Sequence, residues 1–84
     1  MQLKDARAIG DVVAHWTHKQ YDALERAIIS GTRISAYRRG TEFVVVPIRF
    51  RIVRDREAFD ATHPTTGEKI TLYLDEVDSI EVVR

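Results

Sequence analysis

Arginines are the residues of this sequence whose type and spacing could support chemistry. Arg49 and Arg51 are two positions apart in a stretch of alternating apolar residues, so a strand would place them on one face, about 7 Å apart. Guanidinium groups donate paired hydrogen bonds to phosphate oxygens. We therefore predict that these two arginines form the centre of a face that binds nucleic acid or a small anionic ligand. The predicted edge of this face consists of Arg38, Arg39, Arg54 and Arg56, with Tyr37 as a ring that could stack on a base.

The same arginines have acidic counterparts further along the chain. Residues 33–56 carry seven arginines against two acids, whereas residues 57–84 carry seven acids against two bases. Such asymmetry can mark an anion-binding face, but neighbouring strands can also pair these charges across a sheet. Both interpretations stay open. If Arg49 and Arg51 pair with acids such as Glu57 or Asp60, nucleic-acid binding loses its support and a protein–protein adaptor becomes the better interpretation.

Motifs for catalysis, metals and cofactors are missing from the sequence. There is no glycine-rich phosphate loop and no nucleophile elbow. Cysteine is absent, which excludes disulfides and thiolate metal sites. His15 and His18 lie one helical turn apart, but we interpret them as solvated helix residues rather than as metal ligands. We therefore expect no enzyme activity, no catalytic residue, no cofactor and no metal.

Length and charge limit the class of protein. The 84 residues predict a single domain, with a helical segment over residues 1–31 and strands over residues 32–84. The 13 basic and 13 acidic residues give no net charge, which disfavours non-specific nucleic-acid binding because counterion release needs a strong positive field. No signal peptide and no apolar run of membrane-spanning length is visible. We expect a cytoplasmic protein without membrane contact.

The N-terminal third predicts helices. Apolar residues recur at helical spacing from Leu3 to Ile29, and Thr17 with Gln20 makes a capping-box pattern that predicts a new helix start. Gly31 predicts the end of that second helix. We expect Trp16 and Tyr21 to be exposed at this junction, where they could bind a partner protein or a second copy of the chain.

The remaining sequence alternates with a period of two. It predicts five strands, over residues 33–37, 42–54, 57–63, 68–74 and 77–83, in a small antiparallel barrel capped by the helical segment. Pro47 predicts a bend, a bulge or a sheet edge in the long second strand. The predicted core consists of Leu24, Ile28, Ile34, Val44, Val46, Ile48, Phe50, Ile52, Phe59, Ile70, Leu72, Leu74, Ile80 and Val82.

A series of motifs runs through residues 24–83. A helix that ends in "ALERAI" is followed by "TRISAYRRG", by "VVVP" with "IRFRIVRDR", and by "ITLYLDEVDSIEVV". In this order the motifs resemble the WYL domain family, which has an Sm-like small-barrel fold. The Trp-Tyr-Leu triplet that names the family is absent, because Glu57, Ala58 and Phe59 stand at its place.

The resemblance implies a regulatory binding module. WYL domains accompany transcription regulators, helicases and prokaryotic defence systems, and are thought to sense nucleic-acid or nucleotide-like ligands. Two other small barrels are similar as well, the bacterial Sm-like RNA chaperone and the Rho-binding antiterminator. The second of these implies the alternative function, a partner-binding barrel that has no nucleic-acid affinity of its own.

Overall fold

The computed structural model describes residues 16–83. The first predicted helix therefore lies outside the described residues. The elements in chain order are α1 (His18–Ser30), β1 (Ile34–Arg38), β2 (Thr41–Val53), β3 (Arg56–Thr62), β4 (Lys69–Tyr73), η2 (Leu74–Glu76) and β5 (Ser79–Val82). The strands pair as β1–β2, β1–β5, β2–β3 and β3–β4, and each of these pairs is antiparallel. The predicted fold class, a helix followed by five antiparallel strands, is therefore confirmed. No helix within residues 16–83 is long and apolar enough to cross a membrane.

Helix α1 begins and ends where the sequence predicts. The Thr17 hydroxyl accepts a hydrogen bond from the Gln20 amide at 3.3 Å, and Gly31 closes the helix in the left-handed conformation with φ 68°. The second half of the predicted capping box is wrong. The side-chain oxygen of Gln20 does not reach back to Thr17 but accepts the Ile80 amide of β5 at 3.0 Å. Gln20 thus joins the helix to the sheet.

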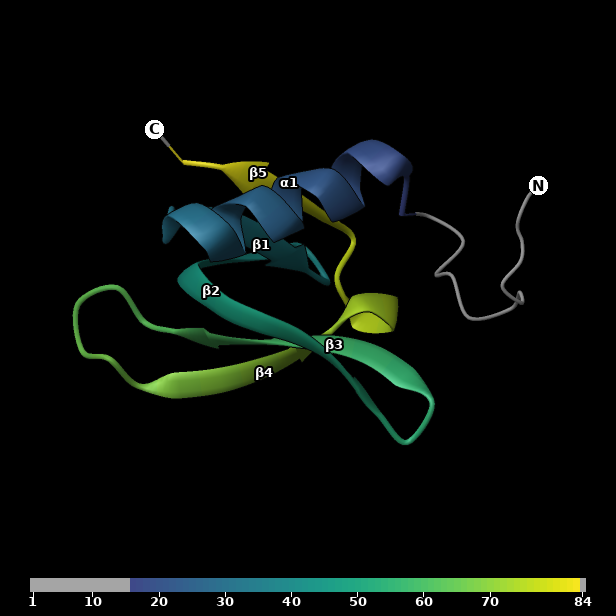
Figure 1. Ribbon diagram of the computed structural model, residues 1–84. Coiled ribbons are helices and arrows are strands. Elements are labelled where there is room, and N and C mark those ends of the chain that lie inside the picture. Colours follow the sequence, from purple (N-terminus) through teal and green to yellow (C-terminus); the bar gives the residue numbers. More distant parts are fainter. Residues whose placement is uncertain (1–15, 84) are drawn as a thin grey trace.

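Strand β2 bends and serves two halves of the sheet. The strand order is β4-β3-β2-β1-β5. Residues 41–45 of β2 pair with β1, residues 46–53 pair with β3, and the register shifts between Pro47 and Arg49. Proline lacks an amide hydrogen, and a bulge is where a central strand tolerates that loss. The irregularity predicted from Pro47 is therefore confirmed as a bulge, and Figure 1 shows β2 curving beneath α1 toward β3 and β4.

The curvature of β2 brings the residues that precede the strand close to those that follow it. A straight strand of 13 residues would span about 40 Å. Yet Glu76 of η2 lies 3.9 Å from the guanidinium of Arg38, just before β2, and 3.1 Å from that of Arg56, just after it. One carboxylate contacts both arginines only because the strand curls round, as the predicted barrel requires.

The core lies between α1 and the concave side of the sheet. Six of the predicted core residues are buried, namely Leu24, Ile34, Phe59, Leu72, Leu74 and Ile80. Three more are partly buried, namely Ile28, Val46 and Ile70. The prediction was wrong for the five that are exposed, which are Val44, Ile48, Phe50, Ile52 and Val82.

The bulge explains the errors at Val44 and Ile48, and the projecting β2–β3 hairpin explains those at Phe50 and Ile52. We assigned the even-numbered residues of β2 to the core, but before the bulge the buried residues are Val45 and Pro47. After the bulge Phe50 lies opposite the buried Phe59 and so faces the core side. The turn of the β2–β3 hairpin projects away from α1 (Figure 1), and Phe50 keeps 38% of its surface exposed.

Trp16 is a core residue and not an exposed partner contact. Only 4% of it is exposed, and its indole Nε1 donates to the Val77 carbonyl at 3.1 Å. The expectation that Trp16 is exposed was therefore wrong, because the turn after η2 offers a buried acceptor that the sequence alone does not reveal. Tyr21 is half-buried beside it, with ring centroids 5.4 Å apart.

Phe59→Ala is expected to lower the free energy of unfolding by about 3–5 kcal/mol, because it removes a fully buried ring. Phe50→Ala is the matched control on the opposite strand, and its cost is expected to be about half as large. Urea unfolding followed by the fluorescence of Trp16, the single tryptophan, measures both. Equal costs would contradict the placement of Phe50 at the rim of the core.

Candidate anion-binding site

Arg49 and Arg51 share one carboxylate. The pairing of β2 with β3 places Arg49 opposite Asp60, and Arg51 follows on the same face, opposite Ala58. The Nε atoms of both arginines donate to the same oxygen of Asp60, Oδ2, at 2.9 Å each. The two arginines therefore lie together, as the sequence predicts. Asp60 also pairs with both, as the alternative interpretation of the sequence predicts.

Asp60 is held in its charged form. Its other oxygen, Oδ1, accepts a hydrogen bond from the Thr71 hydroxyl of β4 at 2.7 Å. Hydrogen bonds from Arg49, Thr71 and Arg51, in that order of importance, hold the pKa of Asp60 well below its usual range. At neutral pH the two arginines and the aspartate therefore carry a net charge of about +1.

The surplus charge faces an open groove. The groove has a volume of about 440 Å³ and is also lined by Lys69, so three cations line it against one carboxylate. The Arg49 side chain is 67% exposed and that of Arg51 is 41% exposed. Within residues 16–83 the guanidinium of Arg49 forms a hydrogen bond through its Nε atom alone. Its terminal N–H groups can therefore donate to an anion. The arrangement can bind a phosphate or a carboxylate.

Two of the predicted edge arginines are engaged elsewhere. The guanidinium of Arg56 lies 3.9 Å from the centre of the Tyr73 ring and donates to both oxygens of Asp75, at 2.9 and 2.7 Å. Hydrogen bonds to Asp75 and then Glu76 raise the pKa of Arg56. Arg38 lies over the Phe43 ring at 4.7 Å. The bonds of Arg56 hold η2 against the sheet, and neither arginine lines the groove.

Tyr37 lies in acidic surroundings. It sits on β1, opposite Glu42 of β2, and its hydroxyl donates to Glu81 of β5 at 3.3 Å. Partial burial, followed by Glu42 and Glu81, raises the pKa of Tyr37. Two carboxylates beside the ring oppose the approach of a phosphate backbone, and Arg49 lies beyond the β2 bulge from this position. The structure therefore does not bring Tyr37 together with the central arginines.

Arg39 lies in the turn between β1 and β2, and Arg54 lies in the turn between β2 and β3. Their φ values are 52° and 49°, and both side chains are exposed. Within residues 16–83 neither forms an ion pair. They add positive charge at opposite ends of β2 but do not line the groove.

Sequence reasoning missed Lys69 and Thr71. Both belong to β4, and they reach the groove because β4 pairs with β3 in a register that sets Thr71 opposite Asp60. The alternation of residues along β4 would have been enough to predict that both lie on the face opposite Ile70 and Leu72. The pairing register of β4 with β3, which brings this face beside Arg49, could not be predicted from the sequence.

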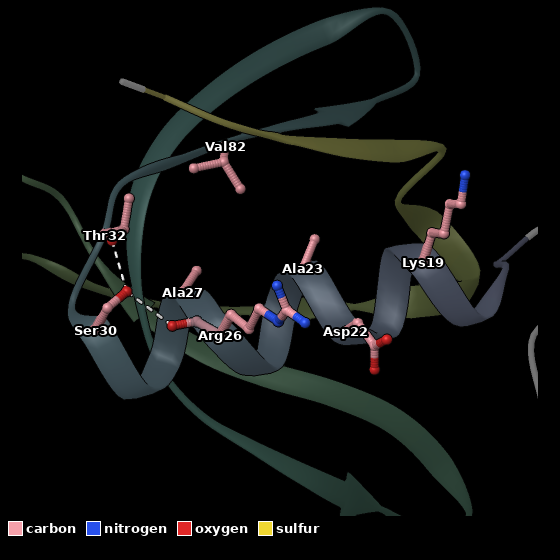
Figure 2. Close-up of a pocket in the computed structure, with 8 residues that line it drawn as sticks. All are labelled: Lys19, Asp22, Ala23, Arg26, Ala27, Ser30, Thr32 and Val82. Atoms are coloured by element: carbon pink, nitrogen blue, oxygen red, sulfur yellow. Dashed lines mark hydrogen bonds between the residues drawn. The ribbon is translucent and has the colours of Figure 1, made fainter.

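A second groove lies between α1 and β5. Figure 2 shows Ala23 and Ala27 of the helix facing Val82 of the strand, with Lys19, Asp22 and Arg26 along the helix. The polar side chains of this groove carry both signs and include no pair of neighbouring guanidiniums. This groove therefore provides fewer guanidinium donors for an anion than the groove at Arg49 and Arg51 does.

Asp60→Asn is expected to lower stability at pH 7 by about 1 kcal/mol, because it removes the negative charge to which two guanidiniums donate. The folded pKa of Asp60 lies below the unfolded value of about 4, so its contribution is present above that pH and is lost as the pH falls further. Urea unfolding at pH 7 and pH 3 should show the difference shrinking in acid. Asp22→Asn, which removes an exposed carboxylate, is the control, and an equal pH dependence in both variants would contradict the assignment.

Comparison with known proteins supports the fold. No family model matches the chain, and no curated protein matches it. Among solved structures, proteasome accessory factor B/C (PafBC) of Arthrobacter aurescens is similar, with a TM-score of 0.66 and 21% sequence identity over 93% of this chain. The match covers 12% of the PafBC chain, so this chain spans about one eighth of that protein's length. The likeness supports the fold alone, a helix followed by a curved antiparallel sheet.

Proposed function

We propose that this chain is a non-enzymatic regulatory binding module that holds a phosphate-bearing ligand in the groove of Arg49, Arg51 and Lys69. One observation carries the proposal: two guanidiniums share a single carboxylate oxygen, so one positive charge stays uncompensated. An incoming phosphate can take hydrogen bonds from the terminal N–H groups without displacing Asp60 from the Nε atoms. The groove then keeps its shape when the ligand binds.

The pairing with Asp60 limits the size of the ligand. Both central arginines pair with Asp60, so binding of nucleic acid loses its support and only a small anion remains as a ligand. The other arginines add little, since the hydrogen bonds of Arg56 go to Asp75 and Glu76. The groove at Arg49 has room for one or two phosphate groups rather than a long strand. A small nucleotide-like ligand therefore fits this site better than a nucleic acid.

A regulatory role is supported by the likeness to PafBC, which is a WYL-domain-containing transcription regulator. The ligand of such a module would report a state of the cell to a larger assembly. The alternative drawn from the sequence, a protein–protein adaptor, predicts that no anion binds in this groove at low salt.

The test is titration of the full chain with inorganic pyrophosphate, adenosine triphosphate and a short oligothymidylate at about 50 and about 200 mM salt. Binding is expected for pyrophosphate and adenosine triphosphate, and the oligothymidylate should bind more weakly than either. Arg49→Gln combined with Arg51→Gln should weaken binding about tenfold or more, because two charge-assisted donors are lost. Asp60→Asn should strengthen binding, because it removes the competing negative charge.

The matched control is Arg39→Gln combined with Arg54→Gln. It removes the same charge from two exposed turns and should change the affinity less than about twofold. If the control weakens binding as much as the central pair does, the binding is non-specific. If the unmodified protein binds none of the three ligands at low salt, the adaptor becomes the better proposal.

A further inference from the structure

An apolar cleft lies on the other face of the same hairpin. Phe50 and Ile52 alternate along β2 with Arg49 and Arg51, so they face the opposite side of the sheet from the anion groove. Their exposed fractions are 38% and 63%. Phe50 and α1 enclose a cleft of about 270 Å³, whose helical wall is formed by Tyr21, Leu24 and Ile28 together with two acidic residues.

The rim of this cleft is acidic. Asp22 and Glu25 of α1 line it, both are exposed, and neither forms an ion pair within residues 16–83. Glu57 lies opposite Ile52 on β3 and accepts a hydrogen bond from the Tyr21 hydroxyl at 2.5 Å. Among residues 16–83, no lysine or arginine lines the cleft. Two carboxylates therefore line the apolar cleft, and the carboxylate of Glu57 lies next to it through its bond to Tyr21.

The helix extends the apolar floor toward its C-terminal end. Ile29 is 83% exposed and follows Glu25 by four residues, so the two side chains are neighbours on one flank of α1. Exposed apolar side chains that gather beside a cleft with a charged rim are typical of a protein-binding surface.

We propose that this cleft docks a protein segment that presents a bulky apolar side chain flanked by lysine or arginine. The volume suits one or two apolar side chains, and it is smaller than the roughly 300–1,000 Å³ that small-molecule ligands usually occupy. Insertion would bury Phe50 and Ile52, and the flanking bases would pair with Asp22 and Glu25.

The acidic rim decides among the occupants. A second copy that used the same surface would place the two acidic rims against each other, since a two-fold interface is self-complementary. The chain's own residues 1–15 carry Lys4 and Arg7 against Asp5 and Asp11, so they offer no excess of basic side chains. A basic segment of a partner protein complements the acidic rim better than a second copy or residues 1–15 do.

The experiment titrates the isotopically labelled full chain with two synthetic ten-residue peptides. Both carry the same leucine and phenylalanine anchors, one flanked by lysine and arginine, the other by glutamate. Backbone NMR shifts are expected at Glu25, Phe50 and Ile52 with the basic peptide, which should bind at least about tenfold more tightly than the acidic one. No shifts with either peptide, or equal shifts with both, would overturn the proposal.

Variants separate the cleft from the rest of the surface. Ile52→Ser should weaken the basic peptide about fivefold to tenfold, because an apolar contact is lost. Glu25→Lys should weaken it about threefold or more through charge reversal. The matched control is Ile48→Ser, an isoleucine of the same strand that is 50% exposed and lines the anion groove instead. An equal loss of affinity in the control variant would show that the peptide binds any exposed apolar residue and would overturn the assignment.

Two outcomes assign the cleft to another occupant and reject the proposal. Nuclear Overhauser contacts between residues 1–15 and Phe50 or Ile52 in the free protein would show that the chain covers its own cleft. A solution mass of two chains that Ile52→Ser converts to one would show that a second copy covers it. Anion titration of Ile52→Ser should be unchanged, because Ile52 does not line the anion groove, and this keeps the test independent of the proposed ligand groove.

Discussion

The bulge in β2 is the constraint on which the rest of the structure depends. Pro47 stands where β2 leaves its pairing with β1 and begins its pairing with β3. Because the strand bends there, one sheet can curve round a core that α1 closes, and Arg38 and Arg56 can meet at Glu76. A straight strand would separate these residues by far more than the reach of one carboxylate.

The bulge also decides which side chains of β2 are available for function. Before it, the odd-numbered residues Val45 and Pro47 are buried, and after it the odd-numbered Arg49 and Arg51 face outward. The odd-numbered residues of β2 therefore contribute to the core before the bulge and to the charged groove after it. Without the shifted register, either the arginines or the core residues would lie on the wrong side of the sheet.

The number of acidic partners distinguishes a structural cluster of arginines from a candidate binding site. Arg56 has three acceptor oxygens on two carboxylates and stacks on Tyr73, so its hydrogen bonds serve to hold η2 in place. Arg49 and Arg51 have one shared acceptor oxygen on a single carboxylate, and their surplus charge faces solvent. The same residue type at similar spacing in the sequence thus ends in two different roles, and the number of acids nearby makes the difference.

The sequence by itself determined the elements and their boundaries where local chemistry decides them. Thr17 starts α1, Gly31 ends it, and Pro47 marks the irregular point of β2, because capping, left-handed backbone and a missing amide act within a few residues. Alternation also placed Arg49 and Arg51 on one face. Tertiary structure alone decided that Trp16 is buried against Val77, that Tyr37 lies among carboxylates, and that Asp60 and Lys69 complete the groove. Those outcomes depend on strand register and on the phase change at the bulge, which join residues far apart in the chain, and no local pattern encodes which strands will meet.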